Sequence, residues 1–101
     1  MSFGYRLDTD RSQCFSDGAI ILYGLPRVSD VMLEVCDDHG GRVRLLVNGT
    51  LAAGDYQAEW DGTSDSGRAA PDGIYRVRLT ANAAGGRVFI QARAITLHRR
   101  G

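Results

Sequence analysis

The sequence predicts an all-β fold, an immunoglobulin- or fibronectin-III-like antiparallel β-sandwich of about seven strands. Short apolar segments recur along the 101 residues with turn residues between them, and helical periodicity is absent. Several of these segments alternate apolar and polar residues, as a strand with one buried face does. The connections are short, whereas a parallel pair would need a crossover of about a dozen residues or more. We therefore expect antiparallel neighbours in two packed sheets.

The chain divides into a short irregular start and one domain. Residues 1–17 are the least regular part, and we expect an N-terminal extension or an edge strand there, with strand residues at 5–7. A single Ig-like domain is expected over residues 18–101, because a chain of this length builds one core. Its first strand, residues 19–25, is largely apolar and is ended by Pro26.

Two alternating strands are expected next, joined by a hairpin turn at residues 38–41, where glycines tolerate a positive φ. In residues 30–37 the expected inward side chains are Val31, Leu33 and Val35, whereas Glu34 faces solvent. In residues 42–47 the expected inward side chains are Val43, Leu45 and Val47. Asn48-Gly49 could then close a tight turn; with Thr50 it also matches a glycosylation sequon, and we prefer the turn.

Three more strands complete the expected sandwich. In residues 55–60 the side chains of Tyr56, Ala58 and Trp60 share one face, and after a polar loop Tyr75, Val77, Leu79 and Ala81 alternate with polar residues. In the last strand, residues 87–98, we expect Val88, Ile90 and Ala92 to face inward, with a β-bulge near Ala94-Ile95.

The expected core and the expected loop residues follow from this alternation. The core is built from Trp60, Tyr75, Val31, Leu33, Val35, Val77 and Leu79. The residues that form the loop after Trp60 and the turn before Tyr75 are Asp61, Gly62, Gly67, Asp72 and Gly73. Their chemistry is that of folding rather than of catalysis.

Composition excludes several classes of partner. Twelve arginines balance twelve acidic residues, so the phosphate attraction on which nucleic-acid binding rests is missing. Apolar runs stay well short of the roughly 20 residues that span a bilayer, and the N-terminus does not have the pattern of a Sec signal. The sequence thus predicts no nucleic-acid partner and no membrane insertion. For the location of the protein, the sequence leaves three alternatives: the protein is cytoplasmic, it is exported by another route, or the chain is a trimmed form.

The sequence gives little support for a metal site or a catalytic site. Asp61, Asp65 and Asp72 could suggest calcium, but their spacing does not match an EF-hand, and turn-forming aspartates explain them better. His39 and His98 have no ligand or catalytic partner at a useful spacing. We expect no catalytic residue, metal or cofactor, and no small-molecule ligand.

The two cysteines, Cys14 and Cys36, lack a chelating or redox spacing. We favour two free thiols. A disulfide between Cys14 and Cys36 is the alternative, because the sequence does not fix the distance between their Cα atoms.

With the strands placed, residues 20–79 resemble the Ig-like domain of flagellar hook-capping proteins. The matching pieces, in order, are Tyr23-Gly24-Leu25-Pro26, Val31-Met32-Leu33-Glu34-Val35-Cys36-Asp37, Gly40-Gly41-Arg42-Val43-Arg44-Leu45-Leu46, Leu51-Ala52-Ala53-Gly54-Asp55-Tyr56, Trp60-Asp61-Gly62, Ser66-Gly67-Arg68 and Gly73-Ile74-Tyr75-Arg76-Val77-Arg78-Leu79. The resemblance implies a compact scaffold that packs against other subunits of an assembly.

The predicted function is that of a non-enzymatic structural or adaptor subunit that docks onto other protein subunits of a larger bacterial assembly. Docking is expected at edge strands, whose backbone groups are unpaired, and at a candidate partner-binding set of arginines, Arg42, Arg44, Arg76 and Arg78. A solvated strand face is an equally good explanation of these arginines. The alternative function is a carbohydrate-binding or adhesion module, which would show an exposed row of aromatic side chains.

Overall fold

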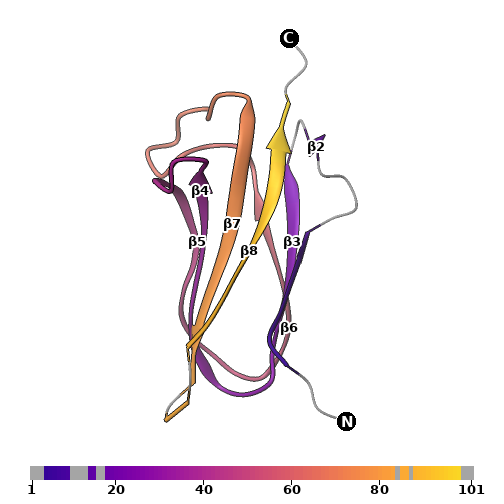
Figure 1. The fold of residues 1–101 in the computed structure, drawn as a ribbon, viewed down its shortest axis with the longest axis vertical. Helices are drawn as coiled ribbons and strands as arrows, with labels where there is room; N and C mark the ends of the chain where they lie inside the picture. The colour runs from indigo at the N-terminus through magenta and orange to yellow at the C-terminus, as the bar shows by residue number, and fades with distance from the viewer. Residues whose placement is uncertain (1–3, 10–13, 16–17, 84, 87, 99–101) are drawn as a thin grey trace.

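A computed structural model describes residues 4–9, 14–15, 18–83, 85–86 and 88–98 of the chain (Figure 1). The strands are β1 (Arg6–Thr9), β2 (Cys14–Phe15), β3 (Ala19–Leu25), β4 (Ser29–Asp37), β5 (Arg42–Leu51), β6 (Gly54–Trp60), β7 (Gly73–Asn82) and β8 (Val88–Leu97). Within the described residues, seven strands have four residues or more, and β2 adds a two-residue segment. The predicted all-β sandwich is confirmed.

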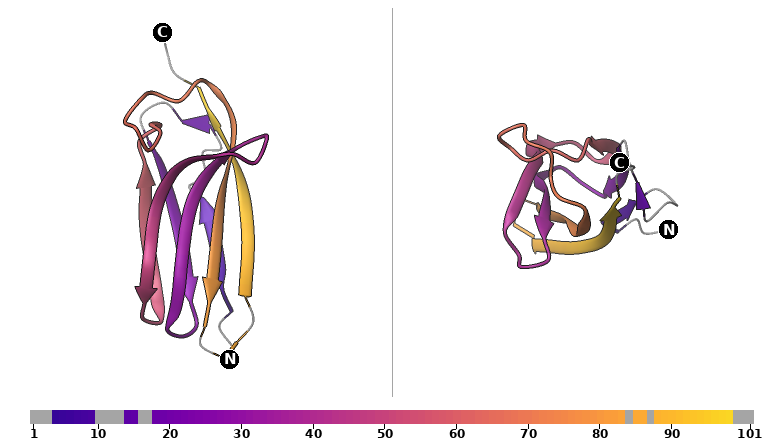
Figure 2. Two further views of the ribbon diagram at one scale, coloured as in Figure 1. Left: turned by 90° about the vertical axis from the view of Figure 1, so that its left-hand side faces the viewer. Right: turned by 90° about the horizontal axis from the view of Figure 1, so that it is seen from above.

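The strands form two sheets. One has the order β1-β3-β6, and the other has the order β2-β8-β7-β4-β5. All pairings are antiparallel except the short contact of β2 with β8, which is parallel. Figure 2 shows β5, β4, β7 and β8 side by side as one layer. Along the sequence, consecutive strands belong to different sheets from β1 to β2, from β2 to β3, from β3 to β4, from β5 to β6 and from β6 to β7.

The core lies between the two sheets and is built from alternate residues of each strand. The expected core residues Trp60, Tyr75, Val31, Leu33, Val35, Val77 and Leu79 are all at most 5% exposed. They are joined by Leu7, Ile21, Tyr23, Leu25, Ile95 and Leu97, among others. The rings of Trp60 and Tyr75 meet edge to face with centroids 5.1 Å apart, a favoured aromatic geometry. Each fully buried large side chain contributes about 1.5–3 kcal/mol.

The predicted turn at Asn48-Gly49 is wrong, because both residues lie inside β5. Their partners are Met32 and Val31 of β4, and pairing continues to Leu51. The local preference of Asn-Gly for a turn is overridden because β4 offers partners along its whole length. The connection to β6 is made instead by residues 52–53.

The predicted bulge at Ala94-Ile95 is also wrong. The pairing of β7 with β8 runs without a shift over ten residue pairs, so β8 keeps one parity throughout. Its inward residues include Ile95 and Leu97, whereas Val88 and Ile90 are 52% and 63% exposed. The expected inward set Val88, Ile90 and Ala92 therefore faces solvent.

The register irregularities lie instead between β4 and β5. Pairing shifts between Leu33 and Glu34 and again between Val35 and Cys36. Each shift inserts an extra residue into β5 and changes which of its side chains face the core. As a result Leu46 packs against the core with Val43 and Val47. The expected inward position of Leu45 is wrong, because Leu45 pairs with Glu34, an outward position.

Candidate docking surface

The five-stranded sheet has an outer face, formed by the side chains that point away from the core. Directly paired residues share a face, so the register arranges this face in rows across the strands. From β5 to β8 the rows are Thr50, Asp30, Asn82, Val88; then Asn48, Met32, Thr80, Ile90; then Leu45, Glu34, Arg78, Ala92; then Arg42, Cys36, Arg76, Ala94. Ile74 extends the face beside Thr96.

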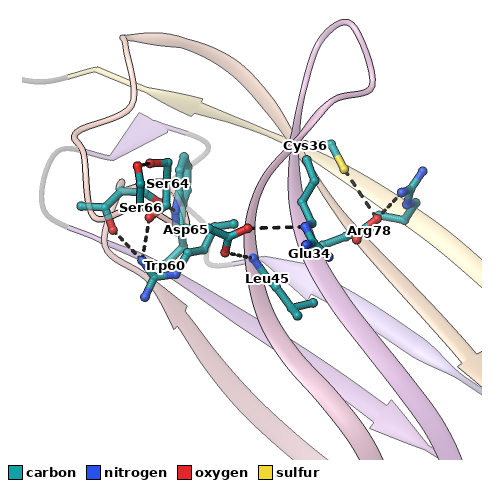
Figure 3. A network of polar contacts seen from close by, with 11 residues as sticks. Glu34, Cys36, Leu45, Trp60, Ser64, Asp65, Ser66 and Arg78 are labelled. Atoms are coloured by element: carbon teal, nitrogen blue, oxygen red, sulfur yellow. Dashed lines mark hydrogen bonds and ion pairs between the residues drawn. The ribbon is translucent and has the colours of Figure 1, made fainter.

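Glu34 is buried on this outer face, at 4% exposure, so its predicted solvation is wrong. Its row places Leu45 on one side and Arg78 on the other. The carboxylate accepts a hydrogen bond from the Arg78 guanidinium, whose side chain is 44% exposed, and another from the Cys36 thiol at 3.8 Å (Figure 3). The charge of Glu34 is thereby neutralised beneath the surface.

These contacts shift two pKa values. Burial raises the pKa of the Cys36 thiol, and the Glu34 carboxylate raises it further, while Arg78 opposes the shift. The hydrogen bond to Glu34 raises the pKa of Arg78. Cys36 is a buried free thiol. The side chain of Cys14 lies outside the described residues.

Three of the four candidate arginines share the outer face. Arg76 and Arg78 lie two residues apart on β7, and both are exposed at the surface. Arg42 lies in the row of Arg76 and forms an ion pair with Asp65 at 3.4 Å. Because adjacent outward residues of a strand repeat about every 6.6–6.8 Å, Arg76 and Arg78 present two guanidinium groups within reach of one partner segment.

Arg44 does not belong to this set. The shift between Val35 and Cys36 pairs Arg44 with Val35, a core residue. Its guanidinium donates to the Thr63 hydroxyl at 3.0 Å and to the Ser64 carbonyl at 2.9 Å. Arg44 therefore holds the loop after β6 and is not placed to meet a partner at the outer face.

The alternation used in the sequence analysis missed an apolar strip on β8. The apolar strip consists of Val88, Ile90, Ala92 and Ala94, all exposed and all on the outer face. Among the described residues, six large apolar side chains are exposed, and four of them lie on this face: Met32, Ile74, Val88 and Ile90. Counting the alternation backward from the apolar end residues Ile95 and Leu97 would have found the strip.

The loop between β6 and β7 is held by its own polar residues (Figure 3). The indole N–H of Trp60 donates to the Thr63 carbonyl at 2.8 Å. Asp61 accepts from the Thr63 hydroxyl at 2.6 Å, and this bond lowers the pKa of the carboxyl. Gly62 and Gly67 have φ values of 84° and 85°, which glycine adopts without strain.

Asp65 ties this loop to the edge of β5. Its backbone N–H donates to the Val43 carbonyl at 2.8 Å, and its side chain accepts from the Leu45 N–H at 2.8 Å. Asp72 faces His98 at 3.8 Å, and Gly73 begins β7. The three loop aspartates thus lie in separate contacts. The described part of the chain contains no group of three or more His, Cys, Asp or Glu side chains that could hold a metal.

A cavity of about 580 Å³ lies between this loop and the β4–β5 turn. Its lining includes Asp37, Asp38, Asp72, Ser64 and Tyr75, and no described histidine lines it. Ser64 shares a hydrogen bond of 2.9 Å with Ser66. The partner of the Ser64 hydroxyl is thus another serine, whereas acyl transfer needs a nucleophile hydrogen-bonded to a base. The described part of the chain also contains no helix long and apolar enough to cross a membrane.

Comparisons with known proteins agree with the fold. The family model described as "FlgD Ig-like domain" matches residues 10–85. The basal-body rod modification protein FlgD of Escherichia coli (strain K12) is 36% identical over 61 residues, which are 60% of this chain and 26% of that protein. The chain therefore spans about a quarter of the length of this curated relative.

Two solved structures are similar. FlgD from P. aeruginosa has 30% identity and a TM-score of 0.58, over 88% of this chain and 62% of that one. FlgD from Xanthomonas campestris has 25% identity and a TM-score of 0.62, over 80% of this chain and 59% of that one. The X. campestris protein is described in connection with the hook capping that is essential for flagellar assembly.

Proposed function

Because this chain belongs to the FlgD Ig-like domain family, we propose that it is a non-enzymatic structural subunit of a flagellar-type assembly. It docks onto other protein subunits through the outer face of its five-stranded sheet. The similarity to FlgD proteins, one of which is described in connection with hook capping, supports a role in a flagellar-type assembly. The site residues on the outer face support the mode of docking.

One observation carries the docking face: exposed arginines lie directly beside exposed apolar side chains. Arg76 is paired with Ala94, and Arg78 with Ala92, so the two arginines flank the alanine half of the apolar strip, whereas Thr80 and Asn82 lie beside Ile90 and Val88. Arginine and methionine are enriched in protein interfaces, and exposed apolar patches mark interaction sites. Glu34, the acidic residue in the same rows, is buried and neutralised by Arg78. Because Arg78 and Arg42 are already paired with Glu34 and Asp65, Arg76 is the cation of this face that would meet an acidic side chain of the partner, next to apolar contacts.

The carbohydrate-binding alternative gains no support from the aromatic side chains. Tyr23, Trp60 and Tyr75 are at most 5% exposed, and Tyr56 stacks on Tyr23 with centroids 5.4 Å apart. These four rings pack in or against the core. Stacking on a sugar ring requires an exposed aromatic platform, which these residues do not provide.

The proposal is tested by purifying the chain with its partners from its native host and comparing two charge reversals. Arg76→Glu changes the outer face, and Arg27→Glu is the control, since Arg27 is exposed in the turn between β3 and β4. We expect stoichiometric co-purification of a flagellar hook or cap subunit with the wild type and with Arg27→Glu, and its loss with Arg76→Glu. A chain that purifies without any flagellar subunit would contradict the assembly. Equal binding by both variants would contradict the docking face.

A further inference from the structure

The four sheet edges of the sandwich differ in how well they are protected. At β5, pairing is interrupted by two shifts, and Asp65 covers the backbone at Val43 and Leu45. The exposed side chains of β6 include the charged Asp55 and Glu59, and β1 has only four residues. Bulges, charges and short length are the devices that keep an edge from pairing with another chain.

The β8 edge has fewer of these devices: its pairing with β7 has no bulge, and its charged residue, Arg93, turns to the inner side, where it donates to the Leu7 carbonyl of β1 at 3.0 Å. Among the described residues, another strand pairs with the outer edge of β8 only at Thr96 and Leu97, where β2 lies, and β1 approaches the inner side of β8, where the rings of Tyr5 and Phe89 stack with centroids 5.0 Å apart. Residues 88–95 pair with β7 alone, in an unbroken register. Their outward side chains are the apolar strip of Val88, Ile90, Ala92 and Ala94, without a charge or a proline. A long, regular and apolar edge is the kind to which a further strand adds.

We propose that a second copy of this chain occupies this edge, with the two β8 strands antiparallel and centred on Gln91. Directly opposite residues in an antiparallel pair share a face, so a self-pairing must be centred on a residue and not between two. Centring on Gln91 pairs Val88 with Ala94 and Ile90 with Ala92 on the outer face. Each large side chain then lies opposite a small one.

The same register also avoids a charge conflict on the inner side. Arg93 is the charged residue of β8. In the proposed pairing it lies opposite Phe89 of the second copy, and Gln91 lies opposite Gln91. Like charges placed directly opposite each other would destabilise a sheet, and this register keeps the two Arg93 side chains apart, each donating to the Leu7 carbonyl of its own chain at 3.0 Å. The segment is thus complementary to itself.

The position of β2 fits this register. The last pair of the proposed contact is Ala94 with Val88 of the second copy, which leaves Thr96 and Leu97 to β2. Beyond Val88 the second copy turns through Gly85 and Gly86 toward β7. The pairing therefore ends where β2 begins. The contact is two-fold and closes on itself, so it stops at a dimer.

The dimer should be weak. A single strand pair buries much less than the roughly 1,200–2,000 Å² of a standard stable interface. Association is expected only as protein concentration rises. The docking face and the dimer contact share the apolar strip of β8 and differ in Arg76, which lies one strand away on β7.

The first test follows the mass of the purified chain by sedimentation velocity at increasing concentration. Ile90→Lys places a charge on the proposed edge. Ile74→Lys is the matched control, since Ile74 has a similar exposure of 56% on the same outer face but lies on β7. We expect a dimer for the wild type and for Ile74→Lys, and a monomer for Ile90→Lys. A monomer throughout, equal association of both variants, or growth into larger species would each overturn the proposal.

The second test checks the register in which the two β8 strands pair. In a background with Cys14→Ser and Cys36→Ser, Gln91→Cys places two thiols opposite each other across the two-fold axis. Paired Cα atoms lie about 4.5–5.5 Å apart, within the range that a disulfide needs. Gln57→Cys on the exposed side of β6 is the control. Faster disulfide-linked dimer formation by Gln91→Cys supports the pairing, and equal rates for the two variants overturn it. Loss of flagellar partners would not affect either test.

Discussion

Arg6 and Asp55 lie on the two outer strands of the three-stranded sheet, and their side chains meet at 2.8 Å across Gly24 of the middle strand. The register places all three in one row. A Cβ added at Gly24 would lie 3.0 Å from the Asp55 carboxylate and 3.6 Å from the Arg6 guanidinium. Because Gly24 has no side chain, the ion pair between β1 and β6 crosses β3 without a steric clash.

Gly24→Val should separate this pair at small cost, because both partners are the ends of flexible, exposed side chains. We expect a double-mutant cycle of Arg6→Ala and Asp55→Ala to give a coupling of about 0.2–1 kcal/mol in the wild type, as for exposed pairs generally. In the Gly24→Val background the coupling should vanish. Urea denaturation at low salt measures it, and an unchanged coupling with Val at position 24 would contradict the geometry.

The Glu34–Arg78 pair should respond unequally to loss of either partner. Arg78→Ala leaves a carboxylate that is 4% exposed without its cation, whereas Glu34→Ala leaves an arginine that is already 44% exposed and can turn to water. After allowance for this exposure, we expect Arg78→Ala to cost about 2–3 kcal/mol and Glu34→Ala clearly less. Chemical denaturation of the two variants checks the order, and a larger loss for Glu34→Ala would contradict it.

Stability should depend on pH through Cys36. Burial raises the pKa of its thiol in the folded protein, so the folded state favours the protonated form. This contribution is fully present below the unfolded thiol pKa of about 8.5 and is lost as pH rises through the folded pKa. The free energy of unfolding should therefore fall above about pH 8.5. Cys36→Ser should remove this part of the decline, and a pH profile identical to the wild type would contradict the assignment.

Asp65 should protect the β5 edge. Its carboxylate accepts the Leu45 N–H at 2.8 Å, as a capping side chain does at a helix end. We expect Asp65→Ala to lose about 1 kcal/mol of stability, the usual net value of a hydrogen bond, because the solvent exposure of Asp65 offsets the gain from its charge. Amide hydrogen exchange at Leu45 should accelerate while exchange at Leu33, in the sheet centre, changes only by the global loss. Unchanged protection of Leu45 would show that the edge is held by other contacts.

The sandwich could be predicted because single strands carry an unambiguous alternation. Val77 and Leu79 are flanked by the polar residues Arg76, Arg78 and Thr80, so only one face can be buried. In β8 both parities carry apolar residues, Val88 and Ile90 on one face and Phe89 and Ile95 on the other. Periodicity cannot decide between them, and the unbroken pairing with β7 does.

The candidate docking set could be predicted only in part, for a related reason. Arg76 and Arg78 follow directly from the alternation of β7. The position of Arg44 depends on register shifts between β4 and β5, and the local sequence pattern does not predict these shifts. The burial of Glu34 likewise depends on Leu45 and Arg78, its neighbours on adjacent strands.

We propose that the outer face of the five-stranded sheet docks onto a flagellar subunit. The most direct measurement is an NMR titration of the labelled chain with the purified hook subunit of its host. We predict that the largest shift changes occur at Arg76, Arg78 and Ile90, while Leu22 and Gln57 of the other sheet change little. Changes concentrated at Leu22 and Gln57, or no binding to any hook or cap subunit, would contradict docking through this face.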